Sequence, residues 1–83
     1  MYYRIKKDKR EELQEGKTLQ YIANKCNYSR QYITDTFNSK VDITKECAIN
    51  ILKGIAKDSI RISTKIKKDG INKAIEYFFE KIK

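Results

Sequence analysis

The segment from Thr18 to Asn38 constrains the fold more than any other part of the chain. It contains two short amphipathic stretches that only a three- or four-residue turn separates. In residues 18–25 an apolar face repeats at spacings of three, four and seven residues, formed by Leu19, Ile22, Ala23 and Cys26. In residues 30–38, Ile33 and Phe37 lie one helical turn apart. The segment therefore predicts two short helices packed against each other.

The residues at the ends of these two stretches are of the types that helix ends prefer. Thr18 and Ser29 are suitable N-caps, because their hydroxyl oxygens accept hydrogen bonds from otherwise unpaired backbone N–H groups. Asn27 tolerates the left-handed backbone conformation that ends a helix sharply. Ala23 is small enough for two helices to approach closely, and Tyr28 is placed to plug the turn. We therefore expect the two helices to cross at a steep angle.

The rest of the chain is expected to form further helices within one domain that spans residues 1–83. Residues 3–15 are rich in helix formers and end at Gly16, a residue type that often follows a helix. The alternation of Tyr3 and Ile5 points to an alternative, because it is typical of a short strand. The expected fold class is therefore all-α, a bundle of about five helices, with a short N-terminal β element as the alternative.

Three more segments complete the expected bundle. Residues 45–56 carry a strong apolar stripe behind Thr44, a suitable N-cap. Residues 70–82 are expected to form an amphipathic C-terminal helix capped by Asp69. In residues 58–68 the isoleucines alternate, which favours a strand, whereas two of them at a spacing of four fit a helix. Both interpretations of residues 58–68 stay open.

The stretch from Thr18 to Lys40 resembles the helix-turn-helix of the phage repressor and Cro-like family, which has the lambda-repressor-like fold. It aligns without a gap with that family's run of threonine, Leu-Ala, a turn glycine, Ser-Arg and Ile, closed by Asn-Gly-Lys. The matching residues are Thr18, Ile22, Ala23, Ser29, Arg30, Gln31, Ile33, Asn38 and Lys40. The helix-turn-helix branch of transposases and resolvases is also similar, from Leu13 to Ala23.

Four positions depart from the repressor pattern. Asn27 and Ser39 replace glycines of the family's run. Leu19 stands where a polar residue that contacts a phosphate is frequent, and Thr36 stands where an apolar residue is frequent. We expect Phe37 to take over the packing role that the family's apolar residue has at the position of Thr36.

The resemblance implies that the second helix enters the major groove of double-stranded DNA with its N-terminal residues at the base edges. The residues implied as base contacts are Arg30, Gln31, Thr34 and Asp35. Arginine bonds bidentately to guanine and glutamine to adenine, so these side chains suit that role. The residues implied as contacts to the DNA backbone, with Tyr32 facing outward, are Lys17, Thr18, Ser29, Tyr32, Asn38 and Lys40.

The chain is strongly basic, with 19 Lys and Arg residues against 11 Asp and Glu residues and a formal net charge of +8. Such an excess favours a polyanionic partner, although a solvated lysine-rich surface is the alternative. Lys65, Lys67 and Lys68 form a cluster in the more basic C-terminal part. This cluster is interpreted either as a phosphate-binding patch or as a solvated segment.

The last expected helix carries more aromatic surface than a small monomer easily covers. We therefore expect it to form a homodimer through Ile75, Phe78, Phe79 and Ile82. Two copies bound to one duplex would then read half-sites about 34 Å apart.

These features together favour a sequence-specific DNA-binding protein, a transcriptional repressor or regulator of a phage or mobile element. One alternative is a protein-interaction module, an inhibitor or antirepressor, that contacts its partner through Tyr77, Phe78 and Phe79. A second alternative is a DNA-binding accessory factor in recombination or plasmid maintenance.

Other classes of protein are not expected. The sequence has no histidine, no glycine-rich phosphate loop and no paired carboxylates in an apolar setting, so we expect no enzyme, cofactor or small-molecule substrate. Cys26 and Cys47 lie at apolar helical positions, which is typical of reduced thiols in a cytoplasmic protein, and two cysteines without histidine do not complete a metal site. Met1 is not followed by an apolar run, and no stretch approaches the roughly 20 apolar residues of a membrane span. We therefore expect neither a signal peptide nor a membrane partner.

Overall fold

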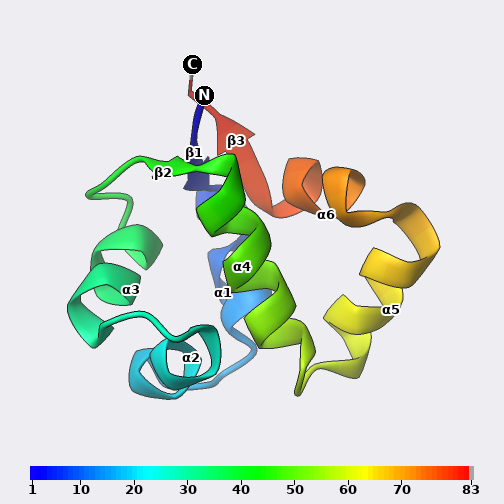
Figure 1. Ribbon diagram of the computed structural model, residues 1–83, viewed down its shortest axis with the longest axis horizontal. Coiled ribbons are helices and arrows are strands. Elements are labelled where there is room, and N and C mark those ends of the chain that lie inside the picture. Colours follow the sequence, from blue (N-terminus) through cyan, green and yellow to red (C-terminus); the bar gives the residue numbers. More distant parts are fainter. Residues whose placement is uncertain (83) are drawn as a thin grey trace.

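The two ends of the chain meet in a small antiparallel sheet (Figure 1). The computed structural model of the chain describes residues 1–82 and places the strands in the order β2-β1-β3. The strands are β1 (Tyr2–Ile5), β2 (Ile43–Thr44) and β3 (Phe79–Lys81). Tyr3 pairs with Ile43 on one side and with Lys81 on the other, so β1 is the central strand. Tyr3 and Ile5 are buried while their neighbours are exposed, which confirms the N-terminal strand and corrects the helix expected from residue 3.

Helices form most of the remaining structure in residues 1–82. They are the 3₁₀ helix η1 (Lys7–Lys9) and the α-helices α1 (Arg10–Gln14), α2 (Leu19–Cys26), α3 (Arg30–Phe37), α4 (Lys45–Ala56), α5 (Ile60–Asp69) and α6 (Ile71–Phe78). Helix α4 runs through the middle of the molecule, with α2 and α3 on one side and α5 and α6 on the other (Figure 1). The expected class, a mostly α-helical small bundle with a short β element, is confirmed.

Within residues 58–68 the chain is helical from Ile60 onward, so the strand interpretation of this segment is wrong. The hydroxyl of Ser59 accepts a hydrogen bond from the backbone N–H of Ile62 at 3.1 Å and so caps the start of α5. Ile62 is buried and Ile66 packs against the core, as the spacing of four requires. Ile60 is 85% exposed, so the alternation of isoleucines does not correspond to a buried strand face.

The expected C-terminal helix ends earlier than residue 82. Helix α6 stops at Phe78, and Phe79 takes up an extended conformation at the start of β3. Adjacent residues of a helix point in different directions, and the change from helix to strand allows both phenylalanines to enter the core. Asp69 does not cap α6; it is the last residue of α5, and Gly70 occupies the N-cap position with φ 89°.

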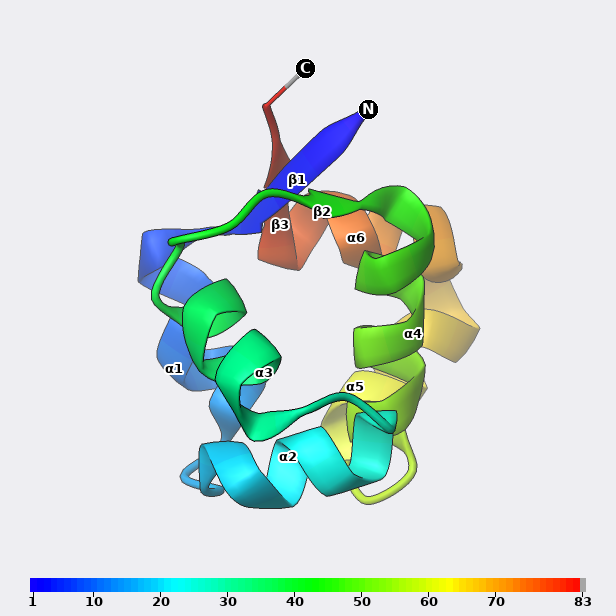
Figure 2. The same cartoon turned by 60° about the vertical axis from the view of Figure 1, so that its left-hand side comes forward.

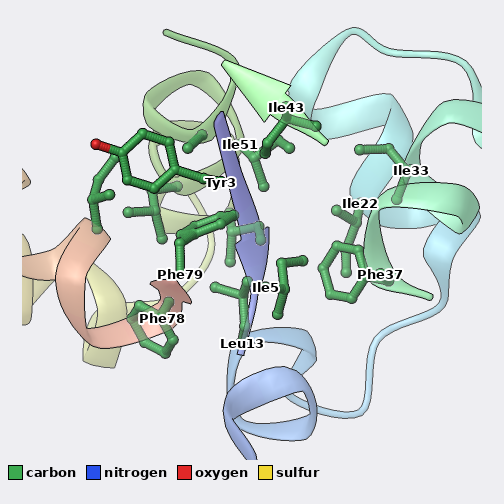
Figure 3. Close-up of a cluster of buried hydrophobic side chains, with 14 of the residues drawn as sticks. Tyr3, Ile5, Leu13, Ile22, Ile33, Phe37, Ile43, Ile51, Phe78 and Phe79 are labelled. Carbon is green, nitrogen blue, oxygen red and sulfur yellow. The ribbon is translucent and has the colours of Figure 1, made fainter. Parts of the chain in front are cut away.

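One hydrophobic core joins the sheet and the helices (Figure 3). Ile22 and Phe37 enter it from the α2–α3 side, Phe78 and Phe79 enter it from the C-terminal side, and Ile5 lies between them. These side chains are all buried. Within residues 1–82, no helix has the length and apolar character needed to cross a membrane.

Candidate nucleic-acid interface

Helices α2 and α3 form a two-helix unit whose N-termini are both capped as predicted. The Thr18 hydroxyl accepts a hydrogen bond from the backbone N–H of Tyr21, and the Ser29 hydroxyl accepts one from that of Tyr32, each at 3.1 Å. Each bond satisfies one of the backbone donors that a helix leaves free in its first turn. The unit therefore begins and ends where local sequence chemistry directs it.

The turn between α2 and α3 also has the predicted geometry. Asn27 adopts a left-handed conformation with φ 61°, and its backbone N–H bonds to the carbonyl of Ala23. Ala23 is fully buried at the point where the two helices approach. The ring of Tyr28 lies 5.0 Å from that of Tyr32 and is partly buried against the core.

The inner face of the unit holds it to the rest of the molecule. Ile22, Ile33 and Phe37 are buried, as predicted. Thr36, which departs from the family pattern, is also buried, and its hydroxyl donates to the backbone carbonyl of Tyr32 at 2.7 Å. Its polar group is therefore satisfied inside the core without an apolar residue at this position.

Helix α4 packs against α2 through a glycine that the sequence did not mark as important. A Cβ atom on Gly54 would lie 2.6 Å from Cys26 Sγ and 3.0 Å from the backbone carbonyl oxygen of Lys25. Cys26 also contacts the carbonyl of Ile51 at 3.6 Å, and burial raises the pKa of its thiol to about 11. The close contact of α2 with α4 therefore fixes the position of the two-helix unit on the core.

The outer face of α3 carries the side chains expected to contact bases. Arg30 and Gln31 are exposed, and Thr34 and Asp35 are partly exposed. Figure 2 shows α3 at the front of the molecule, with no other element covering it from this side. Gln31 Nε2 donates to Asp35 Oδ1 at 2.9 Å, so these two side chains are already paired. Within residues 1–82, no acidic side chain lies within ion-pair distance of Arg30.

The residues expected to contact the DNA backbone differ in their availability. Asn38 and Lys40 are exposed beyond the C-terminal end of α3. Lys17 Nζ is paired with Glu15 Oε1 at 2.9 Å. Tyr32 does not face outward as expected: it is partly buried against Tyr28 and the core, and burial raises the pKa of its phenol.

Two basic residues that sequence reasoning missed lie beside this surface. Lys7 and Arg10 line a groove together with Asn38 and Ser39 at the C-terminal end of α3, and Arg4 and Glu80 also line it. Their proximity depends on the N-terminal strand and η1, which bring the start of the chain next to α3. A local pattern in the sequence does not reveal such a contact.

The prediction of a dimer interface on the last helix is wrong, because most of the residues named for it are buried within one chain. Ile75, Phe78 and Phe79 are each 1% exposed and belong to the core of their own chain. Tyr77 is partly buried against the core, and its hydroxyl lies 3.0 Å from the carboxylate oxygens of Glu12. Ile82 lies beyond α6, where its backbone N–H bonds to the carbonyl of Tyr2. Phe78 and Phe79 are therefore not exposed for contact with a second copy or with another protein.

Comparisons of the chain with protein-family models, with curated proteins and with solved structures found no match.

Proposed function

We propose that the chain is a sequence-specific double-stranded DNA-binding protein that reads the major groove with α3. The observation that carries this proposal is the outer face of α3, where Arg30 is exposed at the start of the capped helix and has no ion-pair partner among residues 1–82. In helix-turn-helix proteins, the N-terminal residues of the second helix contact base edges in this way. A regulator of transcription in a phage or mobile element is the role that suits a single domain of this size.

The side chains of α3 suggest how the bases are read. Arg30 supplies two parallel donors for the O6 and N7 acceptors of guanine. Gln31 is restrained by its hydrogen bond to Asp35, and so presents its remaining donor and acceptor in a fixed orientation. Thr34 lies one turn beyond Arg30 and supplies a hydroxyl and a methyl group for a neighbouring base.

Most backbone contacts would come from the C-terminal end of α3. Lys40, Asn38, Lys7 and Arg10 lie near its C-terminal end and suit phosphates on one strand. Lys17 is a weaker candidate than expected from the sequence, because its charge is compensated by Glu15. A DNA-binding role places the protein in the cytoplasm, which suits the free thiols of Cys26 and Cys47.

The test is a selection of bound sites from random duplex DNA, followed by binding measurements on the selected site. Arg30→Ala should weaken binding to that site by about 1–3 kcal/mol and relax the preference at one base pair. Lys81→Ala is the matched control, because it removes an exposed cation from β3. Log affinity of the wild type should fall linearly with log salt, with a slope near −0.9 for each phosphate contacted.

Two outcomes would count against the proposal. The first is that no sequence is enriched over random duplex. The second is that Arg30→Ala binds every sequence as the wild type does, which would show that α3 is not the reading helix. A palindromic selected site with half-sites about 34 Å apart would indicate two copies on one duplex.

A further inference from the structure

A hollow lies between the turn that joins α2 to α3 and the last turns of α4. We call it the turn hollow; its lining side chains include Lys25, Asn27, Tyr28, Asn50, Lys53 and Lys57. The close contact of Gly54 with Cys26 forms its floor, and Gly54 and Cys26 both line it. The exposed members of the set are Asn27, Asn50, Lys53 and Lys57. The hollow therefore offers ammonium and amide donors to a partner in solution.

The turn hollow carries net positive charge. Lys25 Nζ is neutralised by an ion pair with Asp58 at 3.0 Å. Within the described part of the chain, neither Lys53 nor Lys57 forms an ion pair. Helices α2 and α4 both end at the hollow, and the C-terminus of a helix carries about half a negative charge. Two full ammonium charges exceed these two helix ends, so the hollow attracts an anion.

The turn hollow borders the surface that α3 presents to its partner. Tyr28 lines the hollow and precedes Arg30 by two residues, so their Cα atoms are at most about 7 Å apart. Figure 2 shows the turn at the front of the molecule, running from the end of α2, beside the end of α4, to the start of α3. The major groove of DNA is about 12 Å wide. A duplex that accepts Arg30 in this groove therefore brings a phosphate backbone within reach of the hollow.

The basic groove described above lies at the other end of the same helix. Lys7 and Arg10 line that groove beside the C-terminal end of α3, whereas the turn hollow lies beside its start. The eight residues of α3 span about 12 Å, which is comparable to the width of the major groove. One phosphate backbone borders each side of the major groove. Cations beyond the two ends of α3 therefore suit opposite strands of one duplex.

We propose that the turn hollow binds backbone phosphates on the strand opposite to the one that Lys7 and Arg10 contact, so that α3 is held in the major groove from both ends. Lysine and amide side chains bind phosphate oxygens without reading bases, so this contact fixes the register of α3 and is independent of sequence. The inference rests on the proposed function in taking DNA as the partner and α3 as the helix in the groove. It adds Lys53 and Lys57 of the hollow as positioning contacts.

The first experiment measures the binding of a fluorescent duplex of arbitrary sequence to the full chain as a function of salt. Lys53→Gln with Lys57→Gln should reduce the magnitude of the salt slope by about 1.8, since each lost phosphate contact contributes about 0.9. Lys53→Arg with Lys57→Arg keeps both charges and should keep the wild-type slope. Lys73→Gln with Lys81→Gln is the matched control, because it removes the same charge from exposed sites outside the hollow.

The second experiment locates the contact by hydroxyl-radical footprinting on the selected site. The wild type should protect both strands, and the Lys53→Gln, Lys57→Gln pair should lose protection on one strand only. Replacing the phosphates of that stretch by neutral methylphosphonates should weaken binding of the wild type. The same replacement should leave the affinity of the Lys53→Gln, Lys57→Gln pair unchanged, because the contact is already absent.

Equal salt slopes for the hollow pair and the control pair would overturn the proposal. So would a footprint that the hollow pair leaves intact on both strands. Binding of polyglutamate that the hollow pair abolishes, with an unchanged salt slope on DNA, would assign the hollow to an acidic protein instead. Failure of the α3 proposal is distinguishable, because it shows as a base preference that Arg30→Ala leaves unchanged, whatever the slope of the hollow pair.

Discussion

Glu15 illustrates at the scale of a single residue how distant elements of this fold are tied together. It lies after α1 in a left-handed conformation with φ 52°, which is uncommon for a residue other than glycine. Its carboxylate accepts a hydrogen bond from Ser59 at 2.7 Å and pairs with Lys17, while Arg61 lies 3.5 Å away. These contacts join the turn before α2 to the start of α5. They stabilise the strained backbone at this position.

The contacts of Glu15 predict a pH-dependent contribution to stability. Partial burial by itself would raise the pKa of Glu15, but the hydrogen bonds from Lys17 and Ser59 outweigh it and hold the pKa below its usual value. The stabilisation is therefore fully present above the unfolded-state pKa and is lost as the pH falls through the lower, folded-state pKa. The free energy of unfolding of the wild type should exceed that of Glu15→Gln at neutral pH, and the difference should shrink as the solution becomes acidic.

Urea denaturation at a series of pH values measures this difference. Glu46→Gln is the matched control, because it removes the same charge from an exposed position on α4. A difference between wild type and Glu15→Gln that stays constant from neutral to acidic pH would contradict the interpretation.

The residues predicted correctly from the sequence are those whose role depends on near neighbours in the chain. Thr18, Ser29 and Asn27 cap or end helices through contacts within a few residues, and such contacts are visible as local patterns. The roles of Glu15 and Gly54 depend on residues distant in the sequence, such as Ser59 and Cys26 respectively. No local pattern contains that information.

At the scale of helices and strands, too, the elements set by local contacts are predicted correctly and those set by distant contacts are not. The two-helix unit was predicted because its caps, turn and apolar spacing all agree. The helix predicted for the C-terminal segment runs too far, because Phe79 also suits an amphipathic helix by its spacing, whereas its pairing with Ile5 of β1 requires a strand. The sheet forms only when both ends of the chain meet, so tertiary contacts override the helical preference there.

The packing of α4 on α2 predicts a destabilising effect of a small substitution. Gly54→Ala should favour the helix by up to about 1 kcal/mol, because alanine is the better helix former. The added Cβ would nevertheless lie 3.0 Å from the backbone of α2, which does not yield as a flexible side chain does. We expect a net loss of about 1–3 kcal/mol in the free energy of unfolding.

Thermal or urea unfolding of three variants tests this contact. Lys53→Ala, on the exposed neighbouring position of α4, should change stability little. Adding Cys26→Ala to Gly54→Ala should restore only part of the loss, because it removes the 2.6 Å contact with sulfur and leaves the backbone contact. A Gly54→Ala protein as stable as the wild type would show that the two helices are not as close as described.

At the scale of the whole molecule, burial of the C-terminal aromatic residues means that the chain does not need a dimer to cover them. Phe78 and Phe79 lie in one core with residues from β1 and the two-helix unit (Figure 3). The chain thus covers these aromatic side chains with its own core. This arrangement removes the reason, based on exposed aromatic surface, for expecting a dimer.

The last prediction separates a core role for Phe78 from a dimer-interface role. Phe78→Ala should lower the free energy of unfolding by about 3–5 kcal/mol, because it leaves a cavity in the core. Small domains are stable by only about 5–15 kcal/mol, so much of the population would unfold on mild heating. Circular dichroism measures this loss of stability. Sedimentation at several protein concentrations measures the oligomeric state in parallel. If Phe78 were instead an interface residue, the variant would stay folded and become monomeric, and the melting temperature of the wild type would rise with concentration. A core role requires the same loss of stability at every protein concentration.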